Sequence, residues 1–237
     1  MRPSGPIGIA LLLLPALAAL PFITARSESA AVRIDPPALD APPGEGLETA
    51  VLAGGCFWGV QAVYQHTLGV MNAVSGYAGG GAADANYQSV AYGRTRHAES
   101  VRVTFDPRVV SYGKILHIFF SVAHDPTQLN RQGPDVGAHY RSEIFPQTDA
   151  QRRVATAYIA QLDAARAFAK PIVTRTDADK TTFYPAEDYH QDYALKHPTQ
   201  PYIVINDLPK VANLKTLFPD FYRDTPVTVA QAKAAGH

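Results

Sequence analysis

The middle of the chain shows two different periodicities of apolar and polar residues. From Glu99 to Phe105 every second residue after the first is apolar, which is typical of a strand with one buried face. Val60, Val63 and Tyr64 fall at helical spacing instead. We predict strands over 48–53, 70–77, 99–105, 140–145, 172–176 and 182–184, and helices over 56–66, 112–122, 148–168, 188–196 and 209–217. Their interleaving predicts a two-layer α/β (α+β) domain.

The first 29 residues have the pattern of a secretory signal peptide. Arg2 gives a positive start, an apolar run covers 7–23, and Ser27-Glu28-Ser29 fits the small-x-small rule for cleavage before Ala30. An uncleaved membrane anchor is the alternative, although the run is short for a span and contains two prolines. We therefore expect an exported protein, periplasmic or secreted.

The remaining chain divides into three parts. Residues 30–47 are rich in Pro, Ala, Gly and Asp without an apolar period, and we interpret them as an extended linker. Residues 48–220 contain all of the predicted elements and form one domain. Residues 221–237 end in an Ala-rich stretch and are interpreted as a loosely docked tail.

Composition and charge exclude several classes of function. The 237 residues carry 21 basic and 21 acidic side chains, so no net charge favours nucleic acid or an anionic membrane. The single cysteine, Cys56, excludes an intrachain disulfide and a cysteine-rich zinc site. The eight histidines lack metal-ligand spacing, so we expect no metal site.

Cys56 lies where a predicted strand ends and a predicted helix begins. The first turn of a helix favours a thiolate over a thiol, because its N–H groups are unpaired and the dipole is positive there. The neighbouring Phe57 and Trp58 could form an apolar wall beside such a nucleophile. The alternative is that Cys56 is a small buried core residue.

Glu99 and a few tyrosines are the other candidates for chemistry. A carboxyl group buried among aromatic residues has a raised pKa and can donate a proton near neutral pH. For Glu99 the alternative is an exposed carboxylate at a strand end. Most of the 12 tyrosines, Tyr77, Tyr87 and Tyr92 included, are expected to be packing residues. Tyr140 is more suggestive because it lies in a strand-like run preceded by Asp135.

Six ordered motifs closely resemble the peptide methionine sulfoxide reductase family of the A class. The resemblance covers about residues 49–217. The motifs are Gly55-Cys56-Phe57-Trp58-Gly59, Gly76-Tyr77-Ala78-Gly79-Gly80, His97-Ala98-Glu99, His124-Asp125-Pro126-Thr127, Tyr140-Arg141-Ser142 and Tyr184-Pro185-Ala186-Glu187-Asp188-Tyr189-His190-Gln191. The family implies a ferredoxin-like sandwich around a mixed sheet. It also implies reduction of the S epimer of methionine sulfoxide, free or in peptides, by the domain over 48–220.

The resemblance also implies roles for individual residues. Cys56 corresponds to the nucleophile and Glu99 to the acid, and Tyr87 and Tyr140 correspond to positions that hold the sulfoxide oxygen. A sulfoxide sulfur becomes electrophilic when its oxygen is protonated or strongly hydrogen-bonded, and donors aimed at developing charge contribute about 3 kcal/mol each. Three further positions correspond to substrate contacts, namely Phe57 and Trp58 around the methyl group and Asp135 as a polar neighbour.

Some positions depart from the family pattern. Gln61, His139 and Phe145 stand where Glu, Gln and Tyr are common, and none of them removes a proposed catalytic group. No second cysteine is present to resolve a sulfenic acid at Cys56. We therefore expect no bound cofactor and an external thiol reductant, either a thioredoxin-like protein or glutathione. The expected partners are oxidised methionine-containing proteins and peptides and not nucleic acid, with the enzyme acting as a monomer.

Two other functions remain open at this stage. A Cys-His thiol hydrolase would pair Cys56 with His97 or His190, and it requires a hydrogen bond between that histidine and the sulfur. A non-catalytic binder of oxidised methionine peptides would need no nucleophile.

Overall fold

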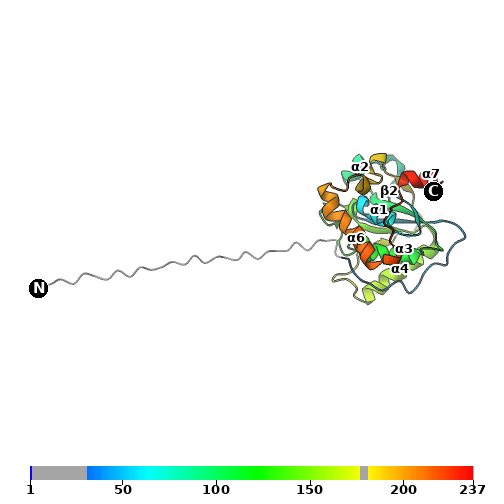
Figure 1. The fold of residues 1–237 in the computed structure, drawn as a ribbon, viewed down its shortest axis with the longest axis horizontal. Coiled ribbons are helices and arrows are strands. Elements are labelled where there is room, and N and C mark those ends of the chain that lie inside the picture. The colour runs from blue at the N-terminus through cyan, green and yellow to red at the C-terminus, as the bar shows by residue number, and fades with distance from the viewer. Residues whose placement is uncertain (2–30, 177–180, 237) are drawn as a thin grey trace.

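A six-stranded mixed sheet forms the centre of the molecule (Figure 1). The computed structural model describes residue 1 and residues 31–176 and 181–236, so the predicted signal peptide lies outside the described residues apart from Met1. The strand order is β7-β6-β1-β3-β2-β8, and every neighbouring pair is antiparallel except β6 and β7. The strands are β1 (Glu48–Gly54), β2 (Val70–Ala78), β3 (Ala98–Phe105), β6 (Ser142–Phe145), β7 (Arg175–Thr176) and β8 (Phe183–Pro185).

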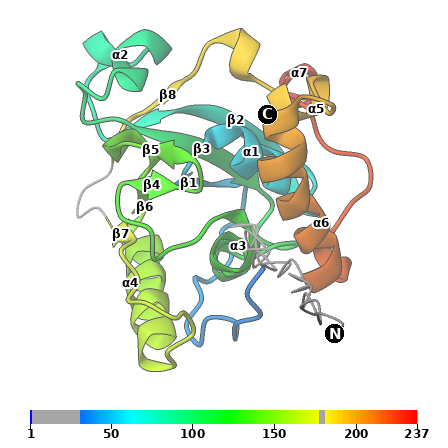
Figure 2. The same cartoon turned by 90° about the vertical axis from the view of Figure 1, so that its left-hand side faces the viewer.

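Three helices cover one face of this sheet (Figure 2). They are α1 (Phe57–Gln65), α3 (Tyr112–Ile118) and α4 (Asp149–Ala164). Alternate residues of β1 and β3, such as Leu52 and Val103, join apolar residues of all three helices in one buried cluster. The four central strands follow the order of a ferredoxin-like sandwich, so the predicted α/β class with a mixed sheet is confirmed.

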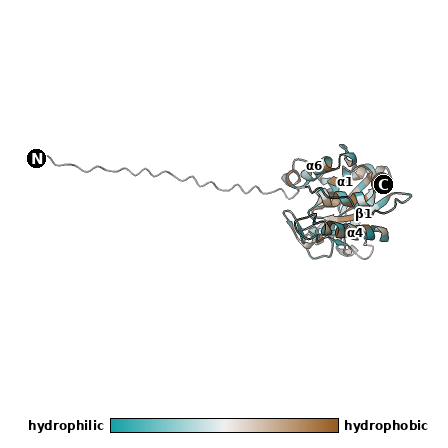
Figure 3. Ribbon diagram, turned by 90° about the horizontal axis from the view of Figure 1, so that it is seen from below, coloured by the Kyte–Doolittle hydropathy of each residue, from teal (hydrophilic) through white to brown (hydrophobic). Residues whose placement is uncertain are grey.

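The remaining elements surround the edges of the sheet. Figure 3 shows the hydrophobic colour on β1 in the interior, whereas α4 at the surface is largely hydrophilic. The other helices are α2 (Tyr87–Ala91), α5 (Tyr193–Lys196), α6 (Leu208–Leu217) and α7 (Val229–Ala234), and a small hairpin joins β4 (Arg131–Gln132) to β5 (Asp135–Val136).

Several predicted boundaries were wrong for identifiable reasons. The helix predicted over 112–122 is interrupted at Ile118, where a π-helical turn covers Phe119–Ala123. The helix predicted over 188–196 is split by Asp192, which has a φ of +58°. The strand predicted from 140 begins at Ser142, because residues Ala138–Tyr140 form a 3₁₀ turn. The short α2 was not predicted, since five residues carry little periodicity.

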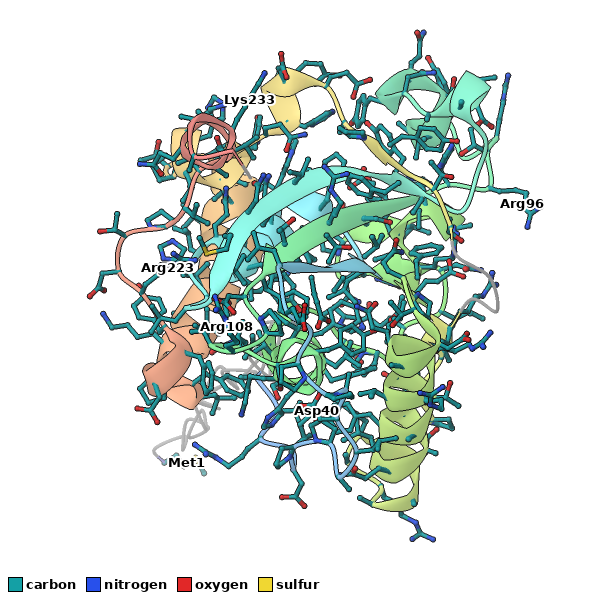
Figure 4. The ribbon with its side chains drawn as sticks, turned by 90° about the vertical axis from the view of Figure 1, so that its right-hand side faces the viewer. Met1, Asp40, Arg96, Arg108, Arg223 and Lys233 are labelled. Carbon is teal, nitrogen blue, oxygen red and sulfur yellow. The ribbon has the colours of Figure 1, made fainter. Side chains whose placement is uncertain are left out.

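The segment 31–47 contains no helix or strand and lies against the domain. Ile34 is buried in the main cluster, and Val32 donates a backbone hydrogen bond to the carbonyl of Ser121 at 2.9 Å. Asp40, labelled beside α3 in Figure 4, accepts a hydrogen bond from the Gly113 N–H at 2.7 Å. At the other end, α7 is capped by Thr228 and buries Ala232. Within the described ranges no helix is long and apolar enough to cross a membrane.

Candidate active site

Cys56 occupies the sharp corner between β1 and α1, as the N-cap residue of the helix. Gly55 makes the corner possible because its φ is +88°, and a Cβ there would lie 2.5 Å from the side chain of Gln132. A Cβ on Gly54 would lie 2.9 Å from the Phe119 ring. The corner is therefore closely packed, and it leaves Cys56 only 8% exposed.

The electrostatics of Cys56 differ from the sequence-based expectation. Burial raises the pKa of the thiol, and the nearby carboxyl groups of Glu99 and Asp207 raise it further. The backbone N–H of Trp58, in the first turn of α1, lowers the pKa as expected but does not outweigh these effects. The helix start therefore acts in the expected direction, but burial and the neighbouring carboxyl groups outweigh it, and Cys56 is a neutral thiol in this state.

Glu99 lies inside the domain beside this thiol. The residue is 3% exposed, and the Phe57 N–H donates a hydrogen bond to Oε2 at 3.1 Å. Burial raises the pKa of Glu99 to about 8, with Asp135 and Asp207 adding to the shift and the Phe57 N–H partly opposing it. The carboxyl is therefore protonated at neutral pH and can act as a proton donor.

Two tyrosines face the same place from different elements. Tyr140 comes from the 3₁₀ turn before β6, and Tyr87 begins α2. Burial raises the pKa of both phenols, and the next contributions come from Glu99 and Cys56. Both phenols are consequently neutral hydrogen-bond donors in the field of the same two groups.

Phe57 and Trp58 form an aromatic wall in the first turn of α1. The Phe57 ring lies 5.0 Å from the ring of His190. The indole Nε1–H of Trp58 donates to His190 Nδ1 at 3.2 Å, and the indole stacks on Tyr193 with ring centroids 3.8 Å apart. These contacts fix the Trp58 ring in one orientation, so the wall is preformed.

Asp135 reaches the site from β5 and has a partner that the sequence did not reveal. The hydroxyl of Tyr202 donates a hydrogen bond to the Asp135 carboxyl. Burial raises the pKa of Tyr202, and Cys56 is the next contributor, so the phenol lies within the field of the thiol. Tyr202 is 67 residues from Asp135 and carries no local motif, so only the folded chain identifies it.

The other residues singled out in the sequence have structural contacts. His97 Nε2 lies 2.9 Å from the Gly81 carbonyl and 3.2 Å from Asp84. Tyr77 donates to Glu187 at 2.9 Å, whereas Tyr92 is 69% exposed. Gln61 is buried and donates to the Ala73 carbonyl and to Gln191.

Neither histidine proposed for a thiol hydrolase is arranged as its base. The Nε2 atom of His97 contacts the Gly81 carbonyl and the Asp84 carboxyl. The Nδ1 atom of His190 accepts a hydrogen bond from the indole of Trp58. No hydrogen bond joins either ring to Cys56 among the described residues. The described ranges also contain no cluster of three or more His, Cys, Asp and Glu side chains that could hold a metal ion.

The fold and site define a single-cysteine α/β protein in which a neutral thiol and a protonated carboxyl lie together in a buried site beside two aromatic rings. Comparison with known proteins identifies the family. A family model described as peptide methionine sulfoxide reductase matches residues 48–220. The chain therefore belongs to the peptide methionine sulfoxide reductase family of oxidoreductases.

Individual relatives agree with this assignment. Peptide methionine sulfoxide reductase MsrA 2 of Mesorhizobium japonicum is 58% identical, covering 82% of this chain and 99% of that protein. A protein of the same name from Synechocystis is 49% identical, covering 79% of this chain and 89% of that protein. Among solved structures, methionine sulfoxide reductase A of Corynebacterium diphtheriae aligns with a TM-score of 0.55 and 31% identity, covering 74% of this chain and 92% of that one. Reduced Mxr1 of Saccharomyces cerevisiae aligns with a TM-score of 0.57 and 29% identity. The alignment covers 69% of this chain and 92% of that one.

Proposed function

We propose that this protein reduces the S epimer of methionine sulfoxide, free or in peptides and proteins, to methionine. Family membership supports the reaction, and one structural observation carries the assignment of roles. Cys56 and the protonated Glu99 occupy one buried site, since the N–H of the residue after Cys56 donates to Glu99. The same two carboxyl groups, Asp135 and Asp207, raise the pKa of both.

The chemical step transfers one oxygen atom. The sulfur of Cys56 attacks the sulfoxide sulfur, Glu99 donates a proton to the sulfoxide oxygen, and the thiol proton restores Glu99 over the cycle. The attack forms an S–S bond between Cys56 and the substrate. This bond and the S–O bond of the substrate then break as the hydroxyl moves to the sulfur of Cys56. Methionine leaves, and Cys56 becomes a sulfenic acid, the first reversible stage of thiol oxidation.

The tyrosines and the aromatic wall orient the substrate in this proposal. The phenols of Tyr87 and Tyr140 donate hydrogen bonds to the sulfoxide oxygen, where charge develops. Phe57 and Trp58 contact the S-methyl group, a contact worth about 1–3 kcal/mol per methyl. Asp135, held by Tyr202, offers a polar contact to the substrate backbone.

An external thiol completes the cycle. Cys56 is the only cysteine of the chain, so the sulfenic acid is reduced through a mixed disulfide with another molecule. The donor we propose is a thioredoxin-like protein or glutathione. Trapping a Cys56 adduct in cell-envelope extracts would identify it, and recovery of no mixed disulfide with any thiol donor would refute this route.

The signal-like pattern of residues 1–29 supports export to the periplasm, where the enzyme would repair oxidised proteins. Cell fractionation tests this placement. Recovery of the full-length chain only in the cytosolic fraction would exclude it.

Turnover of the two sulfoxide epimers tests the function as a whole. Purified protein beginning at Ala30 is incubated with S- or R-methionine sulfoxide, in free and peptide forms, with dithiothreitol as the reductant. We expect methionine from the S epimer only. Hydrolysis of thioester or peptide substrates would favour the thiol hydrolase, and binding without turnover would favour the non-catalytic binder.

A further inference from the structure

A buried ion pair packs against the first turn of α1, next to the site. Asp207 is 0% exposed and ends the π-helical turn Ile203–Asp207, and Lys210 lies one turn later in α6, also buried. Their charged atoms are 3.6 Å apart. A Cβ on Gly59 would lie 2.1 Å from the Asp207 Oδ1 and 2.9 Å from the Lys210 Nζ, so both groups contact the backbone of α1 there. Figure 2 shows α1 and α6 side by side.

The carboxyl of Asp207 is poorly compensated for a buried charge. Among the described residues, its partner is the ammonium of Lys210, 3.6 Å from Oδ1, and no other donor forms a hydrogen bond with either oxygen. Burying a charge without hydrogen bonds is costly, and an apolar pair of similar size often stabilises a fold more. The pair is therefore costly to the fold, and it lies against Gly59, three residues after Cys56.

Several titratable groups face the pair from the surrounding elements. They are Cys56 before α1, Glu99 on β3, Asp135 on β5 and Tyr202 at the start of the π-helical turn, with His124 facing Lys210. Burial raises the pKa of Asp207 to about 6, while Lys210 opposes the rise, so Asp207 is an anion at neutral pH. That negative charge raises the pKa of both Cys56 and Glu99.

We propose that Asp207 is a positioning residue of the catalytic site, whose carboxylate, held by Lys210 against the first turn of α1, keeps Cys56 and Glu99 protonated in the empty enzyme. For Glu99 this rests on the proposed function, because a protonated Glu99 is the acid of that reaction. The part of the proposal that concerns Cys56 does not depend on the proposed function. The thiolate is the reactive form of cysteine, so the charge of Asp207 restrains the thiol from reacting with oxidants and alkylating agents.

Alkylation of the single cysteine by iodoacetamide, followed from pH 7 upward through the midpoint of the thiol, tests this proposal in the free enzyme. We expect Asp207→Asn to lower the midpoint by about 0.5–1 pH unit, which makes alkylation about three to ten times faster at pH values below the midpoint. The exposed Asp220 of the 3₁₀ turn Pro219–Phe221 provides the control, and Asp220→Asn should match the wild type.

The pH dependence distinguishes an electrostatic role from a merely structural one. A change in access to Cys56 multiplies the rate equally at every pH, whereas a changed thiol pKa moves the midpoint. The double variant Asp207→Asn, Lys210→Met leaves no unpaired buried charge and should show a smaller downward shift, because loss of the ammonium opposes loss of the carboxylate. It keeps the test decisive if the single variant folds poorly. An unmoved midpoint in the folded variants would overturn the proposal. Because alkylation needs no sulfoxide, this result is independent of the reductase assay.

Discussion

Glu99 shows how a common residue type acquires an uncommon state. The sequence left a buried acid and an exposed carboxylate as alternatives for this residue, and burial in the structure raises its pKa to about 8. At Cys56 the helix N-terminus, which lowers the pKa of the thiol, was predictable. The burial and the neighbouring carboxyl groups, which raise it, were not. The sequence identifies the residue types of this site, but the balance of their charges depends on residues up to 151 positions apart, such as Cys56 and Asp207.

Replacement of the acid should remove most of the activity. We expect Glu99→Gln to lower kcat about 10²–10⁴-fold, because an amide cannot donate a proton to the sulfoxide oxygen. In the wild type, activity should fall as the pH rises through about 8, since Glu99 then loses its proton. The variant should lack this fall. Steady-state rates from pH 6 to pH 9.5 measure both effects, with Glu45→Gln, at an exposed position, as the control.

Tyr202 should matter for binding more than for chemistry. Tyr202→Phe removes the hydroxyl that donates to Asp135 and leaves a half-buried carboxyl without that partner, which costs about 1–3 kcal/mol. We expect KM for a peptide sulfoxide to rise about tenfold, with a smaller change in kcat. Tyr92→Phe, at an exposed ring, should change neither constant. An unchanged KM in Tyr202→Phe would remove Tyr202 and Asp135 from the substrate site.

At the scale of elements, the regular strands and helices were predictable and the irregular turns that shape the site were not. The strand–Gly–Gly–Cys–helix corner follows from local spacing and glycine content. In contrast, the 3₁₀ turn that carries Tyr140 and the π-helical turn that ends at Asp207 have no periodic signal. Their geometry is set by contacts with residues distant in the chain, and for this reason the sequence placed Tyr140 on a strand.

The corner before α1 should tolerate no side chain at its glycine. Gly55→Ala forces an alanine to adopt a φ of +88° with its Cβ 2.5 Å from Gln132, which costs about 1–3 kcal/mol of backbone strain in addition to the steric clash. We expect a clear drop in the urea midpoint together with loss of activity. Gly46→Ala, where a Cβ meets nothing within 4 Å, should leave both close to the wild type.

For the whole molecule, the sequence predicts one α/β domain, and the structure adds how the segment 31–47 covers it. This segment has no apolar period, so sequence patterning does not reveal its packing. Its contacts with the domain include a hydrogen bond from the Tyr158 hydroxyl to the Asp35 carbonyl at 2.7 Å and the buried side chain of Ile34. We infer that the segment contributes to the stability of the domain.

A matched pair of substitutions measures that contribution. Ile34→Ala deletes a buried side chain from the main cluster and should lower the free energy of unfolding by about 2 kcal/mol or more. Leu39→Ala, at a position that is 47% exposed in the same segment, should change it by less than about 0.5 kcal/mol. Equal, small effects in urea unfolding would show that the segment is not packed on the domain in solution.

The central claim is that Cys56 itself receives the oxygen of the substrate. The most direct measurement is a single turnover of S-methionine sulfoxide without reductant, with methionine quantified and sulfenic acid trapped by dimedone and located by mass spectrometry. We expect one methionine and one modified Cys56 per chain, and neither product from Cys56→Ser. Methionine formed without modification of Cys56, or formed by Cys56→Ser, would contradict it.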